Sequence, residues 1–171
     1  MEKMSIFKKL LILVVLLAVA LPAGSLSEWA CEKYATWATA NPESDTAPWL
    51  LFNVARIHAL MDRKDKAAET YSSFYETYKK PFDEIDDEDP RVAEARYEQA
   101  MCYYDRQPLG EEDAALAHKY FTYFLDRYDG TGKADPEKIK KAADFRAQIL
   151  MDFYQAAKWF WAAEGSANYE P

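Results

Sequence analysis

The chain has 171 residues, half of them apolar and 15% aromatic, which is enough for one domain with a real core and at most a small second domain. Its net charge of −8 opposes binding to nucleic acid and to anionic lipid headgroups, so we set nucleic-acid binding aside. Only 5 residues are glycine, and this scarcity, with many Ala, Glu, Lys and Tyr residues, favours helices over a turn-rich β fold.

Residues 1–24 have the pattern of a secretory signal peptide. Three lysines precede an apolar run over residues 10–21, and Pro22-Ala23-Gly24 then breaks the helix and offers small residues for cleavage. The run is about 12 residues long, which is short for a membrane span of roughly 20. The alternative is that this segment is not cleaved and stays as an amino-terminal anchor. It would then be the only part of the chain that contacts the membrane. Both interpretations predict export to the periplasm or cell envelope, and loss of residues 1–23 would change the net charge from −8 to −10.

A helical domain is predicted over residues 25–164. Apolar residues recur there at helical spacing between short breaking segments. Asp89-Pro90 and Asp135-Pro136 each place a capping residue before a proline at the first helical position, which favours the start of a helix. The predicted helices cover residues 27–40, 47–61, 66–79, 90–105, 111–128 and 136–163, and a frayed tail is expected over residues 165–171.

The connection over residues 83–89 is strongly acidic. It lacks the alternating oxygen ligands and the central glycine of an EF-hand loop, so the sequence does not favour a Ca²⁺ site. We expect a solvated loop whose charge also stabilises the beginning of the following helix.

Three of the predicted helices share one pattern, a small residue followed by aromatic residues four and seven positions later and a large or polar residue eleven positions later. This spacing places the four side chains on one helix face, and the small residue lets a neighbouring helix approach closely. Repetition at this scale indicates stacked helix pairs, while a generic helical bundle is the alternative. The three sets are Ala30, Tyr34, Trp37 and Asn41; Ala67, Tyr71, Phe74 and Tyr78; and Ala117, Phe121, Phe124 and Tyr128.

The helix pairs resemble the tetratricopeptide (TPR) repeat. Ala55 and Ala67 are 12 residues apart, as are the two small positions of a TPR helix pair, whereas Ala100 and Ala117 are 17 apart. The second pair and the following helix, with Ala134-Asp135 at its beginning, are similar to the BamD-like TPR lipoprotein family of the outer-membrane β-barrel assembly machinery. The resemblance implies an α-α superhelix with a long carboxyl-terminal helix and a scaffolding role in the cell envelope, related to outer-membrane assembly.

TPR arrays bind peptides on the inner face of the first helix of each pair. Motif position assigns to that face Phe52, Asn53 and Arg56, and then Tyr97, Glu98, Met101 and Tyr104. A solvated face is the alternative. Trp159, Phe160 and Trp161 point in different directions on a helix, so we expect Trp159 and Trp161 to contact a partner, either another protein or a second copy of the chain.

The sequence carries no pattern that predicts catalysis, a cofactor or a metal. His58 and His118 are the only histidines, and neither lies in a recognisable hydrolase or metal motif. An enzyme or metal-binding protein that uses them with nearby acids is the alternative to a non-enzymatic scaffold. Cys31 and Cys102 could pair after export, but two buried free thiols are the simpler expectation. Cys31 also lacks the small apolar stretch that precedes a lipid-modified cysteine.

Overall fold

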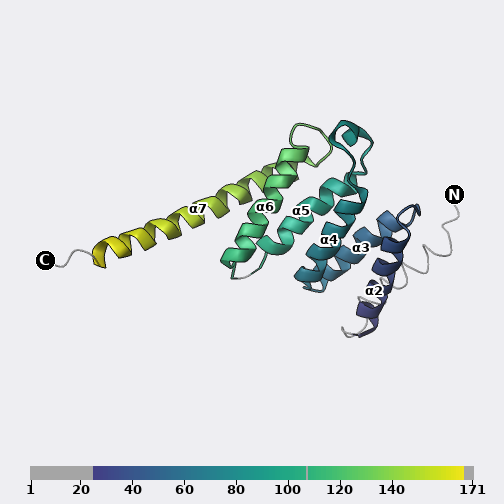
Figure 1. The fold of residues 1–171 in the computed structure, drawn as a ribbon, viewed down its shortest axis with the longest axis horizontal. Coiled ribbons are helices and arrows are strands. Elements are labelled where there is room, and N and C mark those ends of the chain that lie inside the picture. The colour runs from purple at the N-terminus through teal and green to yellow at the C-terminus, as the bar shows by residue number, and fades with distance from the viewer. Residues whose placement is uncertain (1–24, 107, 168–171) are drawn as a thin grey trace. The chain divides into compact units, whose positions relative to one another are not determined.

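The computed structural model of the protein describes residues 25–106 and 108–167, and it confirms the predicted all-α class (Figure 1). Within these ranges the chain forms no β-strand. The predicted signal peptide over residues 1–24 and the last residues of the predicted tail, 168–171, lie outside the described residues. The elements are α2 (Ser25–Ala40), α3 (Ala47–Leu60), α4 (Lys64–Tyr78), the 3₁₀ helix η1 (Phe82–Asp87), α5 (Pro90–Tyr104), α6 (Glu111–Tyr128) and α7 (Pro136–Ala167).

The capping signals locate the helix starts correctly. Asp89 precedes α5 and its Oδ1 accepts a hydrogen bond from the Arg91 amide at 2.9 Å. Asp135 does the same for the Glu137 amide at the start of α7, also at 2.9 Å. The predicted end of the last helix is wrong, because α7 continues to Ala167 and includes the first residues of the predicted tail.

The chain divides into two compact units, Met1–Leu50 and Leu51–Pro171, and the boundary falls inside α3. The described part of the first unit contains α2 and the first turn of α3. On α2 the buried side chains are Cys31 and Ala38, whereas Trp37 is 39% exposed and Tyr34 is half-buried. The prediction that the repeat pattern marks the buried face of α2 is therefore wrong. The small and aromatic residues of that pattern are not the side chains that this helix buries.

In the second unit, α3 and α4 are joined by a turn that is shorter than predicted. Asp62 has a φ of 57°, in the left-handed region that Asp tolerates better than most residues. The turn closes with a hydrogen bond from the Arg63 amide to the His58 carbonyl at 2.9 Å. As a result α4 begins at Lys64, two residues before its predicted start.

The packing of α3 on α4 is centred on three buried rings. Phe52 of α3 lies edge-on against Tyr71 and Phe74 of α4, with ring centroids 5.8 and 5.4 Å apart. Edge-to-face contact is a favoured geometry for aromatic pairs. Ala55 and Ala67 are also fully buried, as expected of small side chains where two helices approach closely.

The pair α5 and α6 repeats this arrangement with different residues. Tyr97 of α5 lies against Phe121 and Phe124 of α6, with ring centroids 6.0 and 5.6 Å apart. Ala100 and Ala117 are fully buried, like their counterparts in the first pair. The two pairs therefore place the same kinds of side chain in corresponding contacts.

A further ring extends the correspondence along the second helix of each pair. Phe74 and Tyr78 of α4 have ring centroids 5.0 Å apart, and Phe124 and Tyr128 of α6 have centroids 5.6 Å apart, both in a tilted geometry. The spacing read from the sequence thus produces equivalent packing in α4 and α6, although not in α2.

The acidic connection between α4 and α5 is anchored rather than fully solvated. Ile85 and Glu88 are buried in it. One oxygen of Glu88 accepts a hydrogen bond from the Tyr128 hydroxyl at 2.7 Å, and the other accepts from the Arg127 guanidinium at 2.7 Å and from the Lys80 amide at 2.8 Å. The expectation of a solvated loop is therefore wrong for Glu88, which ties the connection to the end of α6.

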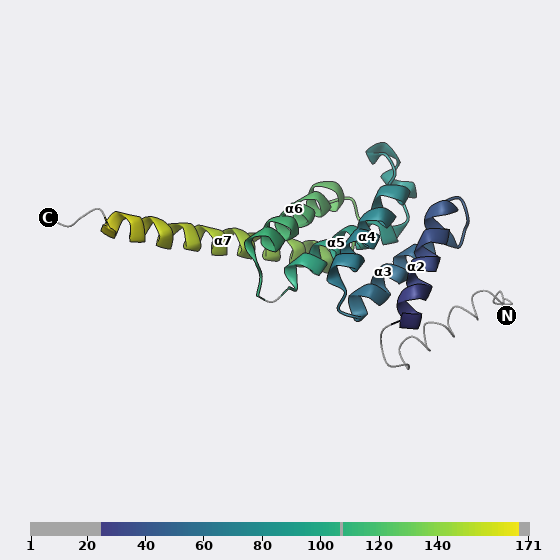
Figure 2. The ribbon, with the colours of Figure 1, turned by 60° about the horizontal axis from the view of Figure 1, so that its bottom comes forward.

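The long helix α7 packs on the second pair through its first half. Phe145 stacks on Tyr104 of α5 with ring centroids 4.4 Å apart, and Ile149 is buried. Beyond that point Leu150, Met151 and Phe153 are exposed. Figures 1 and 2 both show α7 continuing past the end of α6.

Candidate functional site

One side of α5 contacts the first half of α7 through Lys138 and Phe145, with a pocket at one end, and we call this shared surface the α5–α7 groove. Its α5 residues recur every three or four positions, so they lie along one face of the helix. They are Pro90, Ala93, Glu94, Tyr97, Glu98, Met101 and Tyr104.

Lys138 of α7 is the central polar contact of the groove. Its ammonium lies 3.1 Å from Oε1 of Glu94 and 2.9 Å from Oε1 of Glu98. The same nitrogen is 5.0 Å from the centre of the Tyr97 ring. One cation thus joins two carboxylates and an aromatic face, and this fixes the first turn of α7 against α5.

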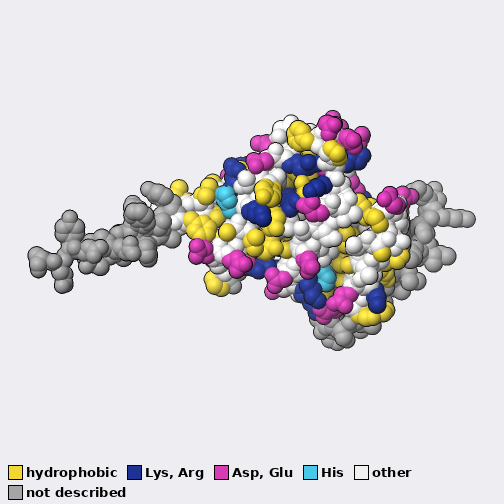
Figure 3. Space-filling model, viewed as in Figure 1, with side chains coloured by type: hydrophobic (Ala, Val, Ile, Leu, Met, Phe, Trp, Pro, Cys, Tyr) yellow, Lys and Arg dark blue, Asp and Glu magenta, His cyan; other side chains and the backbone are white. Residues whose placement is uncertain are grey.

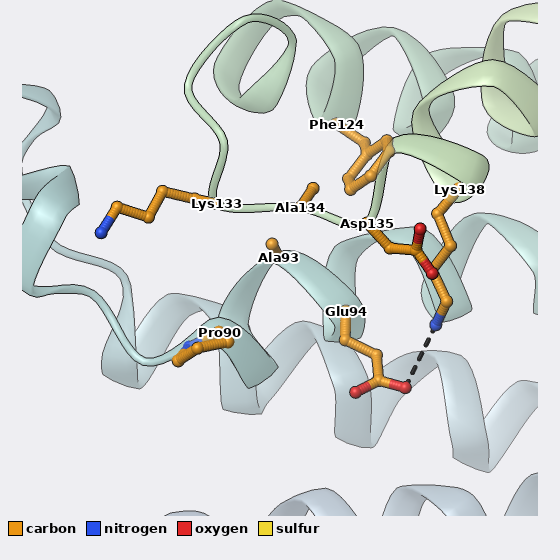
Figure 4. A pocket seen from close by; sticks show the side chains of 8 residues that line it. All are labelled: Pro90, Ala93, Glu94, Phe124, Lys133, Ala134, Asp135 and Lys138. Atoms are coloured by element: carbon orange, nitrogen blue, oxygen red, sulfur yellow. Dashed lines mark hydrogen bonds and ion pairs between the residues drawn. The ribbon is translucent and has the colours of Figure 1, made fainter.

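A pocket of about 210 Å³ lies at one end of the groove (Figure 4). Phe124 of α6, Ala93 of α5 and Ala134 of the α6–α7 loop supply its apolar walls. Glu94 and Lys138 meet at its edge, while the Lys133 side chain points away from them. The pocket therefore combines a small apolar surface with one half-buried ion pair.

Two groups of the groove, the Lys138 ammonium and the Tyr97 phenol, hold their protons at neutral pH. Burial disfavours the charged Lys138 ammonium, but its hydrogen bonds with Glu98 and Glu94 outweigh this effect and raise its pKa. Burial and the nearby Glu98 carboxylate also raise the pKa of Tyr97. An ammonium and a phenol that hold their protons so firmly are poor general bases.

The structure brings the predicted site residues of the second pair together. Glu98, Met101 and Tyr104 are half-buried along the groove, while Tyr97 is buried beneath it. The Tyr97 ring contacts Phe121 and Phe124 of α6. The Tyr104 ring contacts Phe121 of α6 and Phe145 of α7.

The predicted partner-binding residues of α3 differ in how exposed they are. Phe52 is only 4% exposed and belongs to the core with α4. Asn53 is half-buried and Arg56 is exposed, so these two remain accessible. The side chains of Trp159 and Trp161 lie outside the described residues, although the backbone of α7 is helical there.

Sequence reasoning missed Glu94 and Lys138. Glu94 and Glu98 are four residues apart, so they share a helix face, and that signal was available. Their partner Lys138 is 44 positions from Glu94 and 40 from Glu98, and only the packing of α7 on α5 shows the connection.

The residues that could carry other chemistry are separate from the groove. His58 is buried and His118 is half-buried. In the part of the chain that the structure describes, no group of three or more His, Cys, Asp or Glu side chains is arranged to hold a metal ion. Cys31 and Cys102 are both buried and are not joined by a disulfide, as predicted, and burial raises the pKa of the Cys102 thiol to about 12. Such a thiol is a weak nucleophile at neutral pH.

Among the helices with described residues, none has the length and apolar character that a bilayer span requires. Comparison of the chain with protein-family models, curated proteins and solved structures yields no match.

Proposed function

We propose that the protein is a non-enzymatic, TPR-like scaffold that binds another protein in the cell envelope. The repeated aromatic packing of α3–α4 and α5–α6 carries this proposal. Phe52 and Tyr97 occupy corresponding positions, each against two rings of the next helix. A unit built twice in succession is the basis of helical-repeat proteins, whose stacked helices offer extended surfaces for partners.

The α5–α7 groove is the surface on which we expect a polypeptide segment to bind. It lies on the first helix of the second pair, where TPR arrays hold their ligands, and α7 would begin a third pair. Its carboxylate oxygens can accept hydrogen bonds from a peptide backbone, and the neighbouring apolar pocket can hold one small side chain. Arg56 and Asn53 of α3 would supply further polar contacts.

The amino-terminal sequence supports the location in the envelope. Its lysines, apolar run and small residues are typical of an export signal. The acidic charge of the chain argues against nucleic acid as a partner.

Affinity capture from an envelope extract tests the proposal. Full-length protein would be immobilised beside Glu94→Arg, which reverses a half-exposed charge of the groove, and Glu69→Arg, which makes the same change at an exposed position of α4. We expect one partner to be retained by the wild type and by Glu69→Arg, and to be depleted at least fivefold by Glu94→Arg.

Circular dichroism would show that both variants keep their helicity. If the wild type retains no protein above an unrelated helical control, or if both variants retain the same partner equally, binding in this groove is ruled out.

Self-assembly through α7 is the second candidate, and the exposed Leu150, Met151 and Phe153 favour it. Helices that present adjacent apolar side chains to solvent are common sites of association. In that case the captured partner would be the chain itself, and light scattering would show a mass that rises with concentration.

A further inference from the structure

One side of α7 carries an apolar stripe that the rest of the domain leaves uncovered. Phe145 and Ile149 mark the side of α7 that packs on the second helix pair. Consecutive residues of a helix point about 100° apart, so Leu150 lies well around the helix from that side. Leu150 and Met151 are 53% and 54% exposed. Figure 3 shows hydrophobic side chains gathered on α7 where it continues past the end of α6.

The stripe has the spacing of a coiled-coil seam. From Ala143 onward, apolar residues recur at alternating steps of four and three positions. Two such steps add up to seven, the repeat by which paired helices keep one side in contact. Ala143 and Ala147 are exposed, as Leu150 is, and the backbone is helical along the whole stripe. We call this stripe the α7 seam, and it consists of Ala143, Ala147, Leu150, Tyr154, Ala157 and Trp161.

The sizes of the seam residues favour an antiparallel partner helix. Ala143 begins the seam and Trp161 ends it. In a parallel pair of identical helices each residue would meet its own counterpart, so alanine would face alanine at one end and tryptophan would face tryptophan at the other. An antiparallel copy centred on residue 152 instead places Ala143 opposite Trp161. Leu150 then lies opposite Tyr154, so a small residue meets a larger one, as close packing requires.

The charges beside the seam favour the same alignment. Lys140 and Asp144 are exposed, and neither has an ion pair among the described residues. The antiparallel alignment centred on residue 152 brings Lys140 of one copy to Glu164 of the other. It also brings Asp144 near Lys158, whereas a parallel alignment would place Lys140 against Lys140. Opposite charges across a helix pair set its orientation, and like charges oppose it.

The other charged residues of α7 do not oppose this alignment. Glu137 and Lys141 pair with each other at 2.8 Å, and Lys138 is held in the α5–α7 groove. Asp152 lies on the side of the helix opposite the seam. Arg146 falls across from an uncharged residue of the second copy. The alignment therefore joins opposite charges without bringing like charges together along α7.

We propose that two copies of the chain associate through the α7 seam, as antiparallel helices related by a two-fold axis near residue 152. The exposed Met151 and Phe153 would each lie beside their own counterpart at the centre of the interface. A two-fold dimer uses the same surface on both copies, so every other contact occurs twice. The proposal rests on the second candidate function, self-assembly through α7, and it specifies the orientation and register. It makes no use of the α5–α7 groove.

Sedimentation equilibrium of the full-length protein measures the dissociation constant of this dimer. Leu150→Ala shortens an exposed side chain of the seam, and the truncation occurs twice in the dimer, so we expect at least tenfold weaker association. Gln155→Ala is the matched control, at an exposed position of α7 outside the seam, and should leave the dissociation constant unchanged. Circular dichroism would show that both variants keep their helicity.

An exchange of charges tests the orientation. Lys140→Glu alone would set two carboxylates together at each end of the antiparallel seam, and Glu164→Lys alone would set two ammonium groups together. Each single variant should weaken the dimer at least fivefold, whereas the combined variant should recover to within about twofold of the wild type. In a parallel dimer the combined variant would still set like charges together, so it would not recover.

A monomer at every accessible concentration, a dimer that Leu150→Ala does not weaken, or single charge variants that the combined variant fails to rescue would each overturn the proposal. If the dimer fails this test while affinity capture of another protein still depends on Glu94, the groove function stands without self-assembly. If the capture fails and the charge exchange restores the dimer, self-assembly through the α7 seam is supported and binding in the groove is not.

Discussion

Replacing Tyr128 by Phe tests the anchor that holds the α4–α5 connection against α6. The substitution removes only the hydroxyl, which donates to Glu88 at 2.7 Å and accepts from Arg127 Nε at 3.2 Å, while the ring keeps its contact with Phe124. Glu88 would retain its hydrogen bonds from Arg127 and Lys80. Because the Glu88 side chain is 2% exposed, water cannot readily replace the lost donor.

The size of the effect follows from the charge of the acceptor. A hydrogen bond to an ionised group contributes about 1.5–3 kcal/mol, more than a bond between neutral groups. We therefore expect the free energy of unfolding to fall by about 2 kcal/mol. For a chain of this length that corresponds to a decrease in melting temperature of roughly 4–8 °C.

Urea unfolding followed by circular dichroism at 222 nm measures this difference, with Tyr123→Phe as the matched control. The control removes a hydroxyl from a half-exposed tyrosine, so its effect should stay within about 0.5 kcal/mol. A Tyr128→Phe variant as stable as the control would refute the idea that Glu88 is a structural anchor. A double-mutant cycle with Glu88→Gln should give a coupling energy of at least about 1 kcal/mol.

Three further predictions concern the core and its ionisable groups. Ala67→Leu and Ala117→Leu should each cost about 1–3 kcal/mol in urea unfolding because both sites are fully buried, whereas Ala115→Leu on the exposed side of α6 should cost less than about 0.5; equal effects at all three sites would contradict the repeated packing. Stability should fall as the pH rises past about 10, since burial raises the pKa of several tyrosines above the value near 10 that they have when unfolded. Ionisation of the buried tyrosines, measured at 295 nm, should therefore coincide with loss of helicity, and complete tyrosine ionisation well before unfolding would argue against buried phenols. Cys31 and Cys102 should react with a thiol reagent only in denaturant, and fast labelling of the native protein at neutral pH would show that they are accessible.

The sequence predicted the helices well because capping and breaking signals are local. The predicted range of α6 is identical to the observed one, and the Asp-Pro pairs mark the beginnings of α5 and α7. The start of α4 was less accurate, because the left-handed conformation of Asp62 shortens the turn and no composition signal marks it.

The long-range contacts of the candidate site and of the α4–α5 connection were only partly predictable, since they join distant segments. In the connection, for example, the sequence shows Glu88 only as one of several loop acids. Its burial depends on Tyr128 and Arg127, about forty residues away. The core role of Phe52, in contrast, could have been read from the sequence. It lies three positions before the small residue Ala55, exactly as Tyr97 precedes Ala100, and residues at this spacing share a helix face.

Site-specific photo-crosslinking in living cells tests most directly the claim that the protein is a binding scaffold. A photoreactive amino acid would replace Glu94 in the α5–α7 groove or Glu69 on an exposed part of α4 outside it. We predict an adduct of defined mass with another protein at Glu94 and none at Glu69. Absence of an adduct at Glu94, or equal labelling at both positions, would contradict the scaffold proposal.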